Sequence, residues 1–235
     1  MPATTFRRFV EDPSNPYRMG RHQVHDALVP ERAAVVRRGT PIKSVQHTEL
    51  QDPFDQGQIG DCTMNAGYGT IVTAPFGIPG QAPVTQPTIV DGYRMETRLD
   101  DSQIPGHYEP DDTGSTGPWS MTVLEKLGLI RTWHHTRNMT TAFRLLNKGA
   151  FSFGTIWYPS MFKPDKNGLL TVDESEGAAG GHQICITAND TDGRRIYIRN
   201  SWGVKWGLGG HAWLSWHDFA DLLDDGGDVV QPVMA

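Results

Sequence analysis

The order of the predicted helices and strands constrains the fold of this 235-residue chain more than any other feature. Three helical patterns come first, at residues 62–72, 115–128 and 138–149. Four runs rich in aromatic and β-branched residues then predict strands, at residues 151–157, 183–188, 195–200 and 211–216. Helices that precede the strands, rather than alternate with them, favour an α+β fold with an antiparallel sheet.

A group of turn-forming residues separates the second and third predicted strands. Residues 189–193 read Asn-Asp-Thr-Asp-Gly, which is typical of a hairpin loop. If the hairpin is symmetric about Thr191, His182 lies opposite Asn200, within one or two residues of register. The sequence therefore predicts that these two side chains are close together.

The first 47 residues differ from the rest of the chain. They show no sustained helical or strand period and hold eight Arg or Lys against four Asp or Glu. Four prolines interrupt any helix in this segment: Pro13, Pro16, Pro30 and Pro41. We therefore predict an extended arm at residues 1–47 that lies against an acidic body at residues 48–235.

Charge and hydropathy narrow the choice of partners. The net charge of -6 gives no positive field that would attract nucleic acid or an anionic membrane surface. No apolar run reaches the roughly 18 residues needed to span a bilayer, and the first residues lack the apolar stretch of a secretory signal. We expect a cytoplasmic protein, or one associated with a virion if its source is a phage.

The chain has two cysteines, Cys62 and Cys185, too few for a disulfide framework. Cys62 opens the first predicted helix, with Asp61 as its expected N-cap, and a helix N-terminus favours the thiolate. Gln56 precedes Cys62 by six residues, so its side-chain amide and the Cys62 backbone N–H are candidate donors to an oxyanion. We predict that Cys62 is a nucleophile and that Cys185 is a core residue.

A nucleophilic cysteine needs a base that is held in one orientation. His182 begins a predicted strand after two glycines, and Asn200 ends the partner strand. The Asn200 carbonyl can accept the ring N–H without adding a negative charge. We predict His182 as the general base and Asn200 as the residue that orients it.

These segments resemble the papain family of cysteine peptidases, especially bacterial members with a Gln-Gly-Gln-x-Gly-x-Cys-Thr motif, over roughly residues 48–217. Eleven positions agree with the family pattern: Gln56, Gly57, Gly60, Cys62, His182, Asn200, Ser201, Trp202, Gly203, Trp206 and Gly207. The resemblance implies a two-lobe fold, with a helical left lobe, an antiparallel β-sheet or barrel-like right lobe, and the active-site cleft between them.

The resemblance also implies roles for residues around the cleft. It implies that Trp202 shields the hydrogen bond between His182 and Asn200, and that Gly114 and Ser115 hold a substrate backbone. Relatives are often kept inactive by an N-terminal segment, so the predicted arm is a candidate pro-segment or assembly arm. The implied substrate is a protein or peptide.

Four residues depart from the family pattern: Ile59, Asp61, Thr63 and Gln183. Ile59 replaces a disulfide cysteine, which fits a reducing compartment. We expect the Asp61 carboxylate to oppose ionisation of the neighbouring thiol. Gln183 stands where a small apolar residue helps to form a specificity pocket, so we expect a weaker preference for bulky apolar side chains.

Two other functions fit the same residues. One is hydrolysis of cell-wall peptides by a bacterial or phage enzyme, and the other is a papain-like fold kept for binding within a larger assembly. No metal or cofactor is predicted, because zinc spacing, a phosphate loop and a dinucleotide motif are all missing from the sequence. Four acids near the C-terminus predict a solvated acidic tail rather than a calcium site: Asp221, Asp224, Asp225 and Asp228. The oligomeric state stays open.

Overall fold

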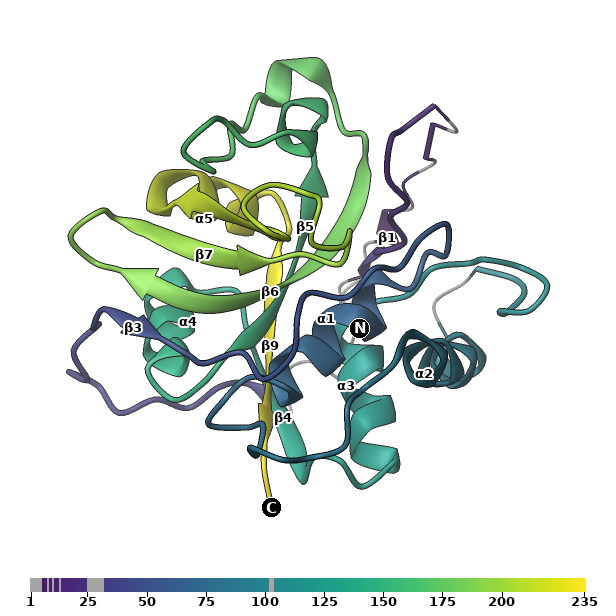
Figure 1. The fold of residues 1–235 in the computed structure, drawn as a ribbon, viewed down its shortest axis with the longest axis horizontal. Helices are drawn as coiled ribbons and strands as arrows, with labels where there is room; N and C mark the ends of the chain where they lie inside the picture. The colour runs from purple at the N-terminus through teal and green to yellow at the C-terminus, as the bar shows by residue number, and fades with distance from the viewer. Residues whose placement is uncertain (1–5, 8, 10, 13, 25–31, 102–103) are drawn as a thin grey trace.

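The computed structural model describes residues 6–7, 9, 11–12, 14–24, 32–101 and 104–235 (Figure 1). The helices are α1 (Cys62–Ile71), α2 (Gln86–Leu99), α3 (Gly117–Lys126), α4 (Met139–Leu146) and α5 (Trp216–Asp224), with 3-10 turns at Pro159–Phe162 and Glu174–Glu176. The strands are β1 (Phe6–Arg7), β2 (Gln23–Val24), β3 (Val45–Gln46), β4 (Thr132–Thr136), β5 (Phe151–Trp157), β6 (Gly180–Asp190), β7 (Arg195–Arg199), β8 (His211–Ser215) and β9 (Asp228–Val233).

The sheet is antiparallel and runs in the order β4, β9, β5, β6, β7, β8, with β3 paired to β6. Helix α1 packs against β5 and β6 and contacts α2 and α3, so these three helices form one half of the molecule (Figure 1). Helices α4 and α5 complete the hydrophobic cluster on the other face of the sheet. The predicted α+β fold with a helical half and an antiparallel half is therefore confirmed.

Side chains of β6 alternate between the two faces of the sheet, as expected for a strand. Ile184 and Ile186 join the hydrophobic cluster that α4 and α5 complete. Cys185 is buried on the face that α1 covers, where a Cβ placed on Gly69 would lie 3.2 Å from the Cys185 Cβ. Only a residue without a side chain allows the helix this close approach to the strand.

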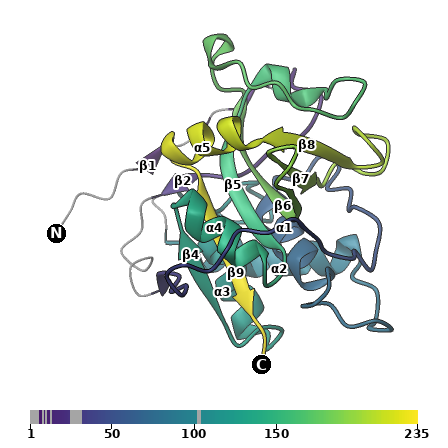
Figure 2. The ribbon, with the colours of Figure 1, turned by 90° about the vertical axis from the view of Figure 1, so that its left-hand side faces the viewer.

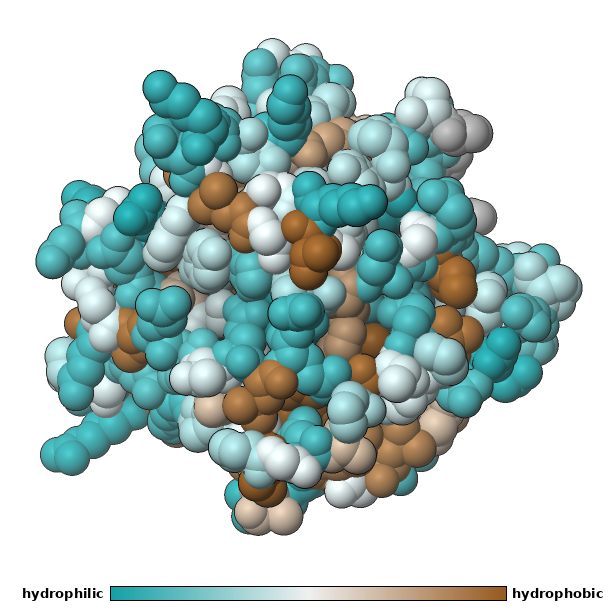
Figure 3. Space-filling view, in the orientation of Figure 1, coloured by the Kyte–Doolittle hydropathy of each residue, from teal (hydrophilic) through white to brown (hydrophobic). Residues whose placement is uncertain are grey.

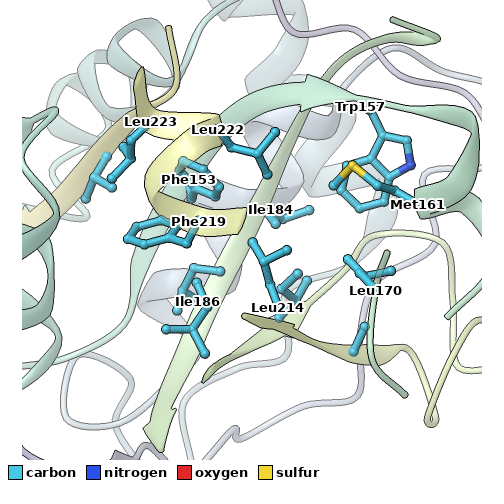
Figure 4. Close-up of a cluster of buried hydrophobic side chains, with 14 of the residues drawn as sticks. Phe153, Trp157, Met161, Leu170, Ile184, Ile186, Leu214, Phe219, Leu222 and Leu223 are labelled. Atoms are coloured by element: carbon cyan, nitrogen blue, oxygen red, sulfur yellow. The ribbon is translucent and has the colours of Figure 1, made fainter. Parts of the chain in front are cut away.

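The larger hydrophobic cluster lies between the sheet and α5 (Figure 4). Phe219 of α5 packs edge-on against Phe153 of β5, with the two ring centroids 4.7 Å apart, and stacks near Phe143 of α4 at 5.6 Å. Leu222 lies beside it on the same helix, facing the strands (Figure 4). A smaller cluster fills the space between α1, α2 and α3, so each half of the molecule has its own core.

The three predicted helices are present, but two helices were not predicted. Helix α2 begins after Thr85, whose side chain accepts a hydrogen bond from the Thr88 N–H at the N-terminus. Helix α5 begins after Ser215, which accepts from Asp218 N–H in the same way. Each cap is a Thr or Ser, a residue type that is common at helix N-termini.

The predicted acidic tail is wrong. Asp221 and Asp224 belong to α5, and Asp228 is buried at the first residue of β9. The apolar residues between these acids explain the difference, because Leu222 and Leu223 face the core and Val229 pairs with Phe153 of β5. Burial of these apolar side chains outweighs solvation of the acids.

The predicted hairpin between β6 and β7 forms with a different register. Asp190 pairs with Arg195, and an irregularity between Ile186 and Ala188 changes the pairing so that Cys185 lies opposite Arg199. A symmetric turn about Thr191 would have paired His182 with Asn200, two residues away from the register that β6 and β7 adopt. The difference arises at the turn, which is centred between Asp192 and Gly193 because Asp190 pairs with Arg195, and the bulge then reduces it by one residue.

Residues 1–5, 8, 10, 13 and 25–31 of the predicted arm lie outside the described residues. Near the start of the arm, β1 lies beside the end of α5, where Arg7 and Asp225 are 3.8 Å apart (Figure 2). At its end, Val45 and Gln46 pair with Asn189 and Ala188 as an added strand of the main sheet. The boundary after residue 47 stays a prediction.

The face of the molecule in Figure 3 is mostly hydrophilic, with hydrophobic side chains in small, separated groups. Among the described residues, no helix combines the length and the apolar character that crossing a bilayer requires.

We expect Phe219→Ala to lower the free energy of unfolding by about 3–5 kcal/mol, because it leaves a cavity beneath the sheet. Urea denaturation followed by circular dichroism measures this loss. Val204→Ala, at a side chain that is 52% exposed, serves as the control and should change stability by about 0.5 kcal/mol or less. Equal effects of the two substitutions would contradict the assignment of Phe219 to the core.

Candidate active site

Hydrogen bonds join the loop before α1 to the residues that follow β7. The Gln56 backbone N–H donates to the Ser201 carbonyl at 2.9 Å, and the Ser201 hydroxyl donates to Gln56 Oε1 at 2.6 Å. One N–H of the Gln56 side chain donates to the Ile59 carbonyl at 2.7 Å. The amide group has a second N–H that remains for another acceptor. The loop therefore holds Gln56 and the start of α1 in place next to Asn200.

His182 and Asn200 are joined by a hydrogen bond between Nε2 and Oδ1 at 2.8 Å. Asn200 Oδ1 also accepts from the Ser201 backbone N–H at 2.8 Å, which fixes the orientation of the amide. The Trp202 ring stacks on the imidazole at 4.5 Å, and the Trp157 ring meets it edge-on at 5.0 Å. The imidazole is thus held in one orientation and shielded from water.

The other ring nitrogen of His182, Nδ1, is buried and has no hydrogen-bond partner among the described residues. Since Nε2 is occupied by Asn200, Nδ1 is the nitrogen that remains to exchange a proton.

The Cys62 thiol lies beside the strand that carries His182. The backbone N–H of Gln183, the residue after His182, lies near the thiol and favours its ionised form. Burial nevertheless raises the pKa of the Cys62 thiol well above its usual range, and Glu11 and Asp61 raise it further. Burial also lowers the pKa of His182 to about 4. In this closed arrangement the thiol and the imidazole are both neutral at pH 7.

The N-terminal arm closes the site. The Arg18 carbonyl accepts from Trp202 Nε1 at 3.1 Å, and Tyr17 stacks on the Trp202 ring at 4.5 Å. Met19 is fully buried and packs within the larger hydrophobic cluster. The Arg21 backbone N–H donates to the Gly181 carbonyl at 3.0 Å, directly before His182. Residues 17–21 therefore lie across the strand end that carries the predicted base.

The opposite side of the arm binds the loop before α3. Ser115 donates its backbone N–H to the Gly20 carbonyl and accepts from the His22 N–H, both at 2.8 Å. The two segments run parallel at the bridge between Arg21 and Ser115. A Cβ at Gly114 would lie 2.2 Å from the Gly20 carbonyl oxygen, so only glycine leaves room for the arm. Gly114 and Ser115, which were predicted to hold a substrate backbone, hold the chain's own backbone in this structure.

Asp112 joins the arm to the catalytic loop. It accepts from Arg18 Nη2 at 3.2 Å, from the Gly60 backbone N–H at 2.9 Å and from the Tyr93 hydroxyl at 2.7 Å. Arg18 also donates to Glu11 at 2.6 Å, and burial raises the pKa of Glu11 to about 7. This cluster therefore anchors the arm to Gly60, two residues before Cys62.

Solved structures with the same chain path are cysteine proteases. Xylellain, a cysteine protease from Xylella fastidiosa, matches with a TM-score of 0.71 and 18% identity over 97% of this chain and 100% of that chain. The bromelain protease from Ananas comosus matches at 0.56 and 12% identity, over 80% and 95% of the two chains. A digestive procathepsin L2 proteinase from Tenebrio molitor matches at 0.56 and 13% identity, over 94% and 81%.

The chain has the papain-like cysteine protease fold. This confirms the fold that the sequence motifs implied. An uncharacterized peptidase C1-like protein of Acanthamoeba polyphaga mimivirus is 31% identical over 80 residues, which is 33% of this chain and 26% of that protein. No family model matches the chain.

Within this papain-like fold, the structure brings together the residues predicted for catalysis: Gln56, Cys62, His182, Asn200 and Trp202. Gln183 is buried, and its side-chain amide donates to Ser152 Oγ at 2.7 Å. The catalytic roles themselves stay predictions. Among the described residues, no three His, Cys, Asp or Glu side chains are grouped as metal ligands.

Several acids around the site were not predicted from the sequence to have a role there. Glu96 of α2 is fully buried, accepts from the Thr63 hydroxyl at 3.0 Å, and has a pKa that burial raises well above its usual range. Asp112 and Asp228 were also missed as functional residues. The unpredicted α2 explains the first omission, and only the tertiary structure brings the other two acids to the cleft.

Asp61 precedes α1, as predicted, but its side chain does not cap the helix. It accepts from Asn65 Nδ2 at 2.8 Å and from Gln86 Nε2 at 2.9 Å. Burial, with the nearby charge of Asp112, raises the pKa of Asp61 to about 8. Asp61 is therefore mostly protonated at pH 7 and opposes thiolate formation less than a carboxylate would.

The raised pKa of Asp61 predicts a loss of stability as pH rises. Between about pH 4 and pH 8 the folded chain keeps a proton that the unfolded chain has released, so the free energy of unfolding decreases through this window. One group contributes a slope of up to about 1.4 kcal/mol per pH unit. Asp61→Asn should remove that part of the slope, as measured by urea denaturation from pH 4 to pH 9.

The matched control is Asp192→Asn, which removes an exposed acid in the turn after β6. It should leave the pH dependence of the wild type unchanged. Parallel curves for the wild type and Asp61→Asn would contradict the protonated state of Asp61.

Proposed function

We propose that this chain is a cysteine peptidase that hydrolyses peptide bonds through a Cys62 thioester. The observation that carries this proposal is the buried His182–Asn200 pair, with Nδ1 of the imidazole unpartnered, beside a thiol at the start of α1. The papain-like fold supports the same chemistry by analogy.

In the first half of the reaction, His182 Nδ1 takes the Cys62 proton and the thiolate attacks the substrate carbonyl carbon. The Cys62 backbone N–H and the second N–H of the Gln56 amide would stabilise the oxyanion. The tetrahedral intermediate collapses as the C–N bond breaks, and the imidazolium returns its proton to the leaving amine. The product is a thioester between Cys62 and the acyl half of the substrate.

In the second half, His182 takes a proton from water, and the resulting hydroxide attacks the thioester carbonyl. The C–S bond breaks, the carboxylic acid leaves, and the proton returns to the Cys62 sulfur. Asn200 keeps the imidazole oriented in both halves, and Trp202 keeps water from competing for the Asn200 hydrogen bond.

The path of the arm supports cleavage within a chain rather than at its end. The arm passes the catalytic residues from Tyr17 to His22 and continues into β2. A groove that accommodates a continuous chain on both sides of the thiol suits an endopeptidase. We further propose that the arm keeps the enzyme inactive until it leaves the cleft, because Cys62 is fully buried while the arm is bound.

Hydrolysis of unfolded casein tests the proposed chemistry in a chain that carries Tyr17→Ala and Arg18→Ala, which weaken the binding of the arm. In this parent chain, Cys62→Ala and His182→Ala should each lower the rate by at least about 10³-fold, because nucleophile and base act as a unit. Cys185→Ala removes the other buried cysteine and should keep activity within about threefold of the parent. Equal activity of Cys62→Ala and the parent would refute the peptidase proposal and favour a binding or assembly role.

Because Cys62 is fully buried while the arm is bound, we expect slow chemical labelling of this thiol in the intact chain. Tyr17→Ala combined with Arg18→Ala removes the ring stacked on Trp202 and the ion pairs to Glu11 and Asp112. A loss of about 1.4 kcal/mol in arm binding would raise the rate of carboxymethylation by iodoacetamide tenfold. We expect at least this increase, measured by mass spectrometry of the peptide that contains Cys62.

Two controls separate arm release from unfolding. Arg38→Ala removes an exposed charge from the arm and should leave the labelling rate unchanged. Labelling of Cys185 should stay slow in every variant, because this thiol is buried between α1 and the sheet. An unchanged Cys62 rate in the double variant would show that the arm does not limit access.

A further inference from the structure

The side chain of Arg21 fills a pocket next to the catalytic residues. It is only 3% exposed, and its Nη2 donates to Asp228 Oδ1 at 2.7 Å and to the Gly226 carbonyl at 3.1 Å. Burial of an arginine to this extent is rare unless the guanidinium is paired. The pocket therefore holds the guanidinium through Nη2 and the charge of Asp228, whereas Nε and Nη1 are buried without a hydrogen-bond partner among the described residues.

Three neighbouring strands build the floor of this pocket. Gly154 of β5 pairs with Asp228 of β9 on one side and with Gln183 of β6 on the other. A Cβ at Gly154 would lie 2.2 Å from Arg21 Nε, so this glycine leaves the space that the guanidinium occupies. Asp228 supplies the charge on one side of Gly154, and Gln183 lies on the other side.

Gln183 leaves an unused acceptor at the pocket. Its Nε2 donates to Ser152, whereas its Oε1 is buried and has no hydrogen-bond partner among the described residues. The same Oε1 lies 2.5 Å from a Cβ placed on Gly154, beside the Arg21 guanidinium. A buried carbonyl oxygen without a donor favours a ligand that brings N–H groups.

Asp228 is charged in this pocket. Burial alone would raise its pKa, but the charge of Arg21 and the contact with His135 Nε2 at 3.4 Å hold the pKa well below its usual range. When the arm leaves, Asp228 loses its stronger partner and keeps only His135. A buried carboxylate without a cation is unfavourable, so the open pocket favours another guanidinium in place of Arg21.

The pocket is within reach of a substrate that binds along the same edge. Arg21 binds the Gly181 carbonyl, and its neighbours Gly20 and His22 bind Ser115 through their backbone groups. Gln183, at the pocket floor, has its backbone N–H near the Cys62 thiol. A peptide backbone held by Ser115 next to Cys62 would therefore direct one side chain into this pocket.

We propose that this pocket is the specificity subsite of the enzyme, that it selects arginine, and that Asp228 determines this selection. The inference rests on the proposed peptidase function and names its substrate class, peptides with an arginine close to the cleaved bond. Lysine should bind less well, because the pocket is shaped for a planar guanidinium, which donates to Asp228 Oδ1 and to the Gly226 carbonyl. The arm then inhibits the enzyme by placing the Arg21 side chain in the subsite.

The first test uses the full chain with Arg21→Ala combined with Tyr17→Ala and Arg18→Ala, which weakens the binding of the arm and leaves the subsite free. A position-scanning library of fluorogenic tetrapeptides should show one position at which Arg exceeds Leu in kcat/KM by at least about tenfold. Asp228→Asn in the same background should abolish this preference, and Asp228→Glu should retain it. The matched control Asp224→Asn removes an exposed acid four residues earlier and should not change the preference. A preference for Leu or Phe that Asp228→Asn leaves unchanged would overturn the inference.

A second test measures binding without turnover. In the same triple-variant chain, the peptide Ala-Ala-Arg-Ala-Ala should protect Cys62 from iodoacetamide at a concentration at least about tenfold lower than its Leu analogue does. Equal protection by the two peptides would overturn the inference even if the chain hydrolyses protein. Selective protection without any hydrolysis would support the arginine subsite and refute the peptidase function. Because this second comparison uses an intact Asp228, it does not depend on how the Asp228 variants fold.

Discussion

The packing of α1 against β5 and β6 is the contact on which the rest of the site depends. It brings a thiol on the first residue of a helix next to the strand that carries His182, and Gly69 lets the helix approach Cys185 closely. Every residue of α1 is buried, because the sheet covers one side and α2 and α3 cover the others. Glycines inside the helix destabilise it by about 1 kcal/mol each, and this enclosure compensates for that loss.

The arm controls both the access and the ionisation of the site. Burial by the arm and the two lobes favours the neutral thiol and the neutral imidazole, since a buried ion pair would lose its hydration. Departure of the arm would let water reach Cys62 and His182, and water stabilises the charged pair that catalysis needs. One segment therefore couples the opening of the cleft to the formation of the nucleophile.

Acids of the same chemical kind differ in charge around this cleft according to their partners. Asp61 and Glu96 are buried beside hydroxyl and amide donors, and burial raises their pKa values, so they favour the neutral form. Asp228 is equally enclosed but lies against Arg21 and His135, which keep it ionised. For Asp228, Arg21 and His135 outweigh burial, whereas for Glu11 burial outweighs the single cation of Arg18 and raises the pKa to about 7.

The sequence alone predicted the helices at residues 62–72, 115–128 and 138–149, the four central strands, and His182, Asn200 and Gln56 as candidate catalytic residues, because these depend on local pattern and motif spacing. It did not reveal α2, whose cap lies among ordinary polar residues, or the turn centre and bulge that together set the register of β6 and β7. The tertiary structure alone decided that residues 17–22 lie along the candidate site and that Asp228 pairs with Arg21. This last contact joins residues 207 positions apart, and no local periodicity records it, because it arises only when β9 is placed beside β5.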